Sequence, residues 1–157
     1  MAADHLANHY GPASVSITSR EFNGSDKREL FFYGLEKTVR LLLAAGKKVV
    51  IMNDTPELPF FPRDAIRLPV NALGGMSLPR SSVMARQAEL RTGIENLRRK
   101  HPEVTVYDPL DVVCDASSCP IVMGDTLLYK DSHHLSTRGS KIVAAHLLAA
   151  IGIENDH

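Results

Sequence analysis

The sequence predicts an α/β protein, a three-layer sandwich in which helices cover a mainly parallel β-sheet. Along the chain, short apolar runs typical of strands alternate with longer segments whose apolar residues recur at helical spacing. The connections from helix to strand are short, which favours parallel neighbouring strands. The chain has 157 residues, 44% of them hydrophobic, enough for one core. We therefore expect a single domain over residues 1–157.

The first half of the chain predicts a strand, a helix and a second strand. Residues 13–18 (ASVSIT) alternate in polarity, as a strand does. Residues 29–46 repeat their apolar side chains at helical spacing, with Asp26 as the expected N-cap and Gly46 as the expected C-terminal stop. The expected apolar stripe of this helix consists of Leu35, Val39, Leu42 and Leu43. The apolar run in residues 47–53 (KKVVIMN) then predicts a buried strand.

The second half begins with a long surface excursion and continues with regular elements. Residues 54–79 hold five prolines and two adjacent glycines, a composition typical of loops. The following segments predict a helix at 80–102, a strand at 103–109 and a hairpin around Gly-Asp within 119–131. The last predicted helix covers residues 138–153, capped by Ser136 or Thr137. The loops after Met52, Tyr107 and Tyr129 are expected at the carboxyl ends of the strands, where ligands bind in such folds.

Charge and hydropathy exclude two classes of function. Lys plus Arg and Asp plus Glu each number 18, a balance that argues against nucleic acid as a partner. No apolar run approaches 18 residues, so no membrane-spanning segment is predicted. The first residues (MAADHLANHYGPAS) lack the basic start and the apolar stretch of a signal peptide.

Two cysteines, Cys114 and Cys119, flank a turn-forming Asp-Ala-Ser-Ser segment. A loop this tight can close a disulfide, which would indicate an oxidising compartment, or it can carry two free thiols. A metal site is poorly supported, because further soft ligands at suitable spacing are missing.

The segment KDSHHLS holds the best candidate for chemistry. Asp131 and His134 are three residues apart just before the last helix, a spacing that can place a carboxylate beside an imidazole. Such a carboxylate fixes the tautomer of the ring and stabilises its protonated form, while the other ring nitrogen accepts a proton from a nucleophile. The non-catalytic alternative is that Asp131 caps the helix and His134 is an ordinary surface histidine.

Three segments together resemble one family: GLEKTVRLLLAAGKKVVIMNDTPELPF, VYDPLDVVCDASSCPIV and LLYKDSHHLSTRGSKIVAAHL. They are similar, from about Val15 to the C-terminus, to SGNH hydrolases, and most of all to the extracytoplasmic SGNH domain fused to bacterial membrane O-acyltransferases. The resemblance implies a flavodoxin-like sandwich and a Ser-His-Asp triad in which His134 is the base and Asp131 orients it. It also implies O-acyl groups, such as O-acetyl groups, of surface polysaccharides as substrates. It implies a periplasmic or extracytoplasmic location and no metal or organic cofactor.

The family's G-D-S-H nucleophile block has no counterpart in this sequence. The GDT at Gly124–Thr126 lies in the predicted hairpin and has no serine, and Asn23 is a poorly placed oxyanion candidate. The first strand and helix of an SGNH domain also have no counterpart, so we expect an N-terminally truncated domain. A separate membrane acyltransferase chain could then carry the nucleophile. The alternatives are a non-catalytic remnant, a glycan-binding or assembly module, or an intracellular metal-dependent hydrolase.

Several other side chains near the motif have simpler interpretations. Ser132 and Ser136 lie too near His134 along the chain to serve as its nucleophile, and Ser136 is better explained as a cap. His133 is expected to face solvent or to be structural, and a metal site built on it would lack a fourth ligand. His146 is expected on a partly buried helix face. Phe60 and Phe61 could line a substrate groove, although packing of their loop against the sheet is favoured.

Overall fold

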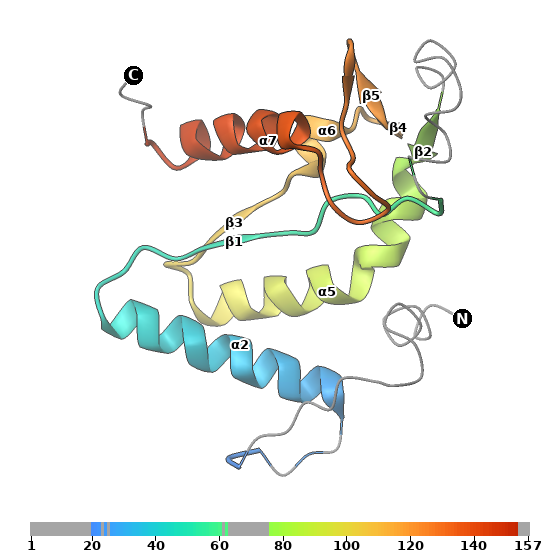
Figure 1. The fold of residues 1–157 in the computed structure, drawn as a ribbon. Helices are drawn as coiled ribbons and strands as arrows, with labels where there is room; N and C mark the ends of the chain where they lie inside the picture. The colour runs from blue at the N-terminus through green and yellow to red at the C-terminus, as the bar shows by residue number, and fades with distance from the viewer. Residues whose placement is uncertain (1–19, 23, 25, 61, 63–75, 154–157) are drawn as a thin grey trace. The chain divides into compact units, whose positions relative to one another are not determined.

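The structure, a computed structural model, describes residues 20–22, 24, 26–60, 62 and 76–153 (Figure 1). The predicted strand at 13–18 and most of the predicted surface excursion, together with Asn23 and Phe61, lie outside these residues. The chain forms two compact units, one from residues up to Val50 with 92–105 and one from residues 51–91 with 106 onward. Each unit is described by itself.

The main element of the first unit is helix α2 (Lys27–Ala44), which has the predicted Asp26 cap and Gly46 stop but begins and ends two residues before the predicted 29–46. The Asp26 side chain accepts a hydrogen bond from the Arg28 N–H at 2.8 Å and caps the N-terminus. At the other end Gly46 has a φ of +70°, and its N–H donates to the carbonyl oxygen of Leu43. The Lys47 N–H donates to the carbonyl oxygen of Leu42, which completes a Schellman motif.

The apolar stripe predicted for α2 was only partly right. Val39 is 2% exposed and Leu35 and Leu43 are partly buried, but Leu42 is 41% exposed. The helix instead buries Leu30 at its first turn, and the Phe32 ring lies where a Cβ atom at Gly93 would stand, so a larger residue there would require this ring to move. Spacing alone identified the helix but not which of its faces is covered.

The strands β1 (Val50–Met52) and β3 (Thr105–Tyr107) pair with each other and lie side by side in Figure 1. The Thr105 N–H donates to Val49 O at 3.0 Å, and the Asn53 N–H donates to Tyr107 O at 2.9 Å. Residue numbers rise together along both strands, so the pair is parallel, as predicted. The prediction that the first of them is buried was too strong, because Met52 is 47% exposed.

Two antiparallel strand pairs belong to the second unit. The predicted hairpin is present as β5 (Val122–Met123) and β6 (Thr126–Leu127), joined through Gly124 with a φ of +61°. The other pair, β2 (Ser77–Pro79) with β4 (Ser118–Pro120), was not predicted. Its two strands stand about 40 positions apart in the sequence. Strand β2 lies at the end of the proline-rich segment that was predicted to be a loop.

Three helices accompany these strands: α5 (Arg80–Lys100), the single turn α6 (Leu110–Val113) and α7 (Thr137–Ala150). Helix α5 gives its first half to the second unit and its second half to the first. The core of the second unit consists of Leu58, Val83, Leu110, Val113, Cys119, Ile121, Val122, Leu128, Tyr129 and Val143. The described residues therefore form a mixed α/β structure with one parallel and two antiparallel pairs. The three-layer sandwich, the missing first strand and helix, and the single domain remain predictions.

Candidate active site

Asp131 and His134 are joined by direct hydrogen bonds within one tight turn. The Nδ1 atom of His134 lies 2.9 Å from both carboxylate oxygens of Asp131. The backbone N–H groups of His133 and His134 donate to Oδ1 of Asp131 at 2.9 Å and 2.8 Å. The side chain of His134 is 76% exposed, so the ring is open to solvent while Nδ1 is held. The structure thus brings the two predicted site residues together.

The surroundings of Asp131 keep its carboxyl group ionised. The hydrogen bond from the His133 N–H is the largest cause, and the bonds and charge from His134 add to it, lowering the pKa of Asp131 to about 2. An ionised Asp131 accepts a hydrogen bond from Nδ1–H of His134, which leaves Nε2 as the nitrogen that can take up a proton.

The turn is anchored at both of its ends by the backbone. Tyr129 and Leu135 form an isolated antiparallel bridge, and the Lys130 N–H donates to His134 O at 2.9 Å. On the far side, the Ser136 hydroxyl donates to Leu127 O at 2.7 Å and accepts from the Gly139 N–H at 3.0 Å. Ser136 is therefore the N-cap of α7, one of the two caps predicted for this helix.

Gly139 allows the first turn of α7 to approach the backbone at Leu128, just after β6. A Cβ atom at Gly139 would lie 2.3 Å from the carbonyl oxygen of Leu128, closer than real contacts of this kind. The same carbonyl oxygen accepts from the Ser136 N–H at 2.7 Å. A residue without a Cβ atom is therefore required where the helix meets the backbone before the Asp131 turn.

The loop after β1 lies against this turn. The loops after Met52 and Tyr129 were both predicted at the carboxyl ends of the strands, which agrees with this contact. The Leu58 N–H donates to the carbonyl oxygen of Ser132 at 2.8 Å. Asp54, in the same loop, is close enough to His133 for the two charges to interact. Crowding of its carboxyl by protein atoms is the largest cause that raises the pKa of Asp54, and the charge of Glu57 acts in the same direction.

Asn53 and Asp54 are polar residues of the loop beside the turn that the sequence interpretation did not single out. Asn53 is 7% exposed, and its Oδ1 is buried without a hydrogen-bond partner among the described residues. Both directly follow a predicted strand, and the carboxyl end of such a strand is where ligand-binding groups gather. Their place after KKVVIM was the signal that could have found them.

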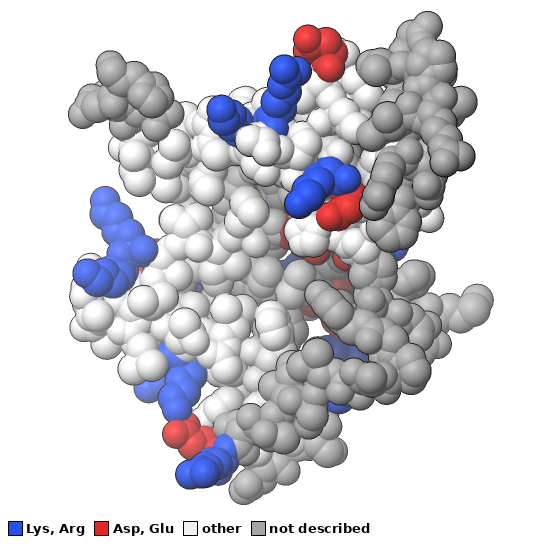
Figure 2. All heavy atoms as spheres, in the orientation of Figure 1, with Lys and Arg blue, Asp and Glu red and all other residues white. Residues whose placement is uncertain are grey.

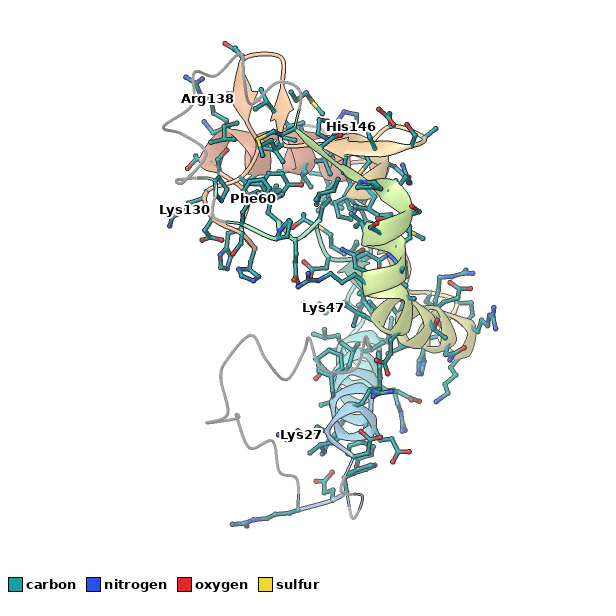
Figure 3. The ribbon with its side chains drawn as sticks, turned by 90° about the vertical axis from the view of Figure 1, so that its right-hand side faces the viewer. Lys27, Lys47, Phe60, Lys130, Arg138 and His146 are labelled. Carbon is teal, nitrogen blue, oxygen red and sulfur yellow. A yellow bond between two sulfur atoms is a disulfide. The ribbon has the colours of Figure 1, made fainter. Side chains whose placement is uncertain are left out.

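The other candidate side chains occupy structural positions. Ser132 is 5% exposed and its hydroxyl lies 2.8 Å from Nδ1 of His133. This contact lies within the turn itself, so His133 has a structural role there. Phe60 packs against the core of the second unit, and Figure 3 shows it inside that unit whereas Lys130 points away. His146 is exposed, so its predicted partly buried face was wrong.

Cys114 and Cys119 form a disulfide, visible as a yellow bond in Figure 3. Asp115, inside the closed loop, accepts hydrogen bonds from the backbone and hydroxyl groups of Ser117 and Ser118. These bonds, led by the one from the Ser117 N–H, lower the pKa of Asp115 to about 2. Arg80 also donates to the carbonyl oxygen of Asp115 at 3.0 Å, which ties the loop to the start of α5.

The described residues contain neither a cluster of metal ligands nor a helix that could span a membrane. Within the described ranges, no group of three or more His, Cys, Asp or Glu side chains is arranged to hold a metal ion. The disulfide also removes the free thiols that the metal-dependent alternative requires. No helix in the described part of the chain is long and apolar enough to cross a membrane. On the face shown in Figure 2, Lys and Arg lie in separate small groups, several of them beside Asp or Glu.

Residues 3–149 match the family model described as the SGNH domain fused to AT3, or acyltransferase-3, domains. Because the match covers most of the chain, the protein belongs to this family, as its resemblance indicated. Membership associates the chain with ester hydrolysis and acyl transfer. No curated protein and no solved structure gives a significant match.

Proposed function

We propose that this chain is an acyl-transfer or ester-hydrolysis module that acts on O-acyl groups of cell-surface glycans. In this proposal His134 is the general base and acid, and Asp131 orients and stabilises it. The observation that carries the proposal is the bond from Nδ1 of His134 to the ionised carboxylate of Asp131, on a ring exposed to solvent.

The chemistry follows from this geometry. A serine hydroxyl attacks the ester carbonyl while Nε2 of His134 takes its proton, and Asp131 stabilises the imidazolium through Nδ1–H. His134 then gives the proton to the departing sugar oxygen, and an acyl-enzyme remains. Water or an acceptor hydroxyl releases the acyl group by the same steps in reverse order. General-base help of this kind contributes about 10²- to 10⁴-fold in rate.

The nucleophile must come from outside this sequence. The sequence contains no G-D-S-H block. We therefore propose that a preceding segment or a separate membrane acyltransferase chain supplies the serine, and that residues 1–157 form an SGNH domain without its first strand and helix. The association of the family with acyltransferase-3 domains supports this partner.

An extracytoplasmic location fits the disulfide. Cys114 and Cys119 are paired, and such bonds persist mainly in oxidising compartments such as the periplasm. Surface glycans are accessible from that side of the membrane, which is consistent with the proposed substrate class.

Hydrolysis of p-nitrophenyl acetate tests the proposal. The chain alone should show no turnover above that of free imidazole, and co-expression with a chain that carries the G-D-S-H block should restore it. His134→Ala should abolish the restored activity, because the members of a triad act as a unit. His146→Ala, which removes another exposed histidine, is the matched control and should retain activity.

Two results would contradict the proposal. Turnover by the chain alone that is lost in His134→Ala would show that no external serine is needed. No gain on co-expression would refute the two-chain enzyme and favour the second candidate, a non-catalytic remnant or a glycan-binding module. The absence of the serine block from the sequence is the observation that favours this second candidate.

A further inference from the structure

We propose that Gln87 is a positioning residue, which clamps the loop at 53–58 so that this loop holds the turn containing Asp131 and His134. The role of the clamp in catalysis rests on the proposed function. The clamp itself consists of hydrogen bonds, and these can be tested without an activity assay.

The side-chain amide of Gln87 donates hydrogen bonds from its Nε2 atom to two carbonyl oxygens of the loop after β1. Gln87 is 7% exposed on helix α5, and its Nε2 donates to the carbonyl oxygens of Asp54 at 3.1 Å and Thr55 at 3.0 Å. A buried amide is costly unless its hydrogen-bonding groups are satisfied. A polar side chain at this buried helical position therefore calls for a specific partner, and the loop backbone is that partner.

Arg91, one turn further along α5, fixes the orientation of the amide. Its Nε and Nη2 donate to Oε1 of Gln87 at 2.9 Å and 2.8 Å. A guanidinium can only donate, so the oxygen of Gln87 must face Arg91 and the nitrogen must face the loop. Arg91 also forms an ion pair with Asp108, with Nη2 2.9 Å from Oδ1. Because Asp108 directly follows β3, the clamp joins the loops at the ends of both parallel strands.

The clamped loop in turn contacts the turn that carries the candidate pair. The Leu58 N–H donates to Ser132 O at 2.8 Å, and Ser132 stands between Asp131 and the two histidines. A second tether comes from the same helix, because Arg86 forms an ion pair with Glu57. Hydrogen bonds thus connect α5 to the backbone of the turn through a single short loop.

The variant Gln87→Glu tests this connection because it removes both donors, although it also adds one negative charge. A glutamate keeps the shape of the side chain and the acceptor for Arg91, but its carboxylate would face the carbonyl oxygens of Asp54 and Thr55. We expect the Leu58 amide hydrogen to exchange at least about tenfold faster, as the loss of about one to two net hydrogen bonds implies.

The pKa of Asp131, followed by ¹³C NMR of its carboxyl carbon, is the second measurement. If the turn loses its support, the N–H groups around Asp131 relax, and its pKa should rise from about 2 toward its ordinary value. This readout reports the surroundings of the Asp131–His134 pair. Because the charge of the glutamate can itself raise the pKa of Asp131, the uncharged variant Gln87→Asn should show the same rise if the turn has relaxed.

Val83→Ala is the matched control. Val83 lies one turn earlier on α5 and is 4% exposed in the core, so this variant lowers the stability of the second unit without touching the clamp. It should leave the pKa of Asp131 unchanged, and any faster exchange at Leu58 should match that of other core amides of the second unit. If Gln87→Glu does not fold, Gln87→Asn, which keeps the amide but shortens its reach by one methylene, serves in its place.

The outcomes separate the clamp from the proposed function. If Gln87→Glu behaves like Val83→Ala in both measurements, the clamp is refuted, while loss of activity in His134→Ala would still support the catalytic pair. If Gln87→Glu shifts both readouts but the co-expressed enzyme keeps its activity in His134→Ala, the clamp stands and the catalytic role of the pair is refuted.

Discussion

The close approach at Gly139 gives a prediction whose size can be worked out from the structure. In Gly139→Ala, the added Cβ would lie 2.3 Å from Leu128 O, and this distance must rise to 3.0 Å or more, a shift of about 0.7 Å. The obstacle is backbone, which cannot rotate away as a side chain can. Overpacking of this kind costs about 1–3 kcal/mol, and weakening of the Ser136 N–H bond to the same carbonyl adds about 1 kcal/mol. Alanine regains about 1 kcal/mol as a better helix former, so the net loss should be about 1–3 kcal/mol.

Gly34→Ala is the matched control for this prediction. Gly34 lies inside helix α2, and a Cβ atom there would meet nothing within 4 Å. The same substitution should therefore stabilise the protein by about 0.5–1 kcal/mol. Urea unfolding followed by circular dichroism measures both variants. A midpoint for Gly139→Ala equal to or above that of the wild type would refute the argument that α7 needs glycine at this contact.

Two further predictions concern titrating groups. Because the pKa of Asp131 is lowered to about 2, its interactions stabilise the fold above about pH 4 and are lost as the pH falls toward 2. Asp131→Asn should flatten this acid-side loss in urea unfolding measured at several pH values, and an unchanged slope would contradict the assignment. Burial raises the pKa of Tyr129, whose hydroxyl has no hydrogen-bond partner among the described residues, so stability should fall as the pH rises above about 10. Tyr129→Phe should reduce this alkaline loss and raise the unfolding free energy at neutral pH by about 1 kcal/mol, whereas a decrease would reveal a partner of the hydroxyl.

Features that depend on a few neighbouring residues could be predicted from the sequence. The Asp26 and Ser136 caps, the glycine stop of α2 and the Gly-Asp hairpin each depend on side chains within about one turn of the position concerned. The Asp131–His134 pair belongs to the same class, because its spacing of three residues sets the geometry within the turn itself.

Features that depend on distant partners could not be predicted in this way. Strand β2 exists because β4 pairs with it, and nothing in the proline-rich segment before it signals that partner. Likewise, Leu42 fits the helical stripe by spacing but remains exposed, because periodicity does not say which face the rest of the chain covers. The role of Gln87 is hidden for the same reason, since its partners lie more than 30 positions away.

The contrast between features set by neighbouring residues and features set by distant partners bears on whether the chain is an active module or a remnant. The bonds that make the Asp131–His134 pair lie within the turn, so a chain no longer selected for catalysis could still form the pair, although less firmly without supports outside the turn. Catalysis needs more, because Nε2 of His134 must point at a nucleophile held by another segment, and errors of about 1 Å can cost about 10²-fold in rate. That direction depends on supports outside the turn: the contact at Gly139, and the clamp from Gln87 through the loop at 53–58. A buried amide is costly once its hydrogen-bond partners are lost, so a remnant whose loop at 53–58 had changed would be expected to lose Gln87 as well. The intact clamp therefore favours the active module.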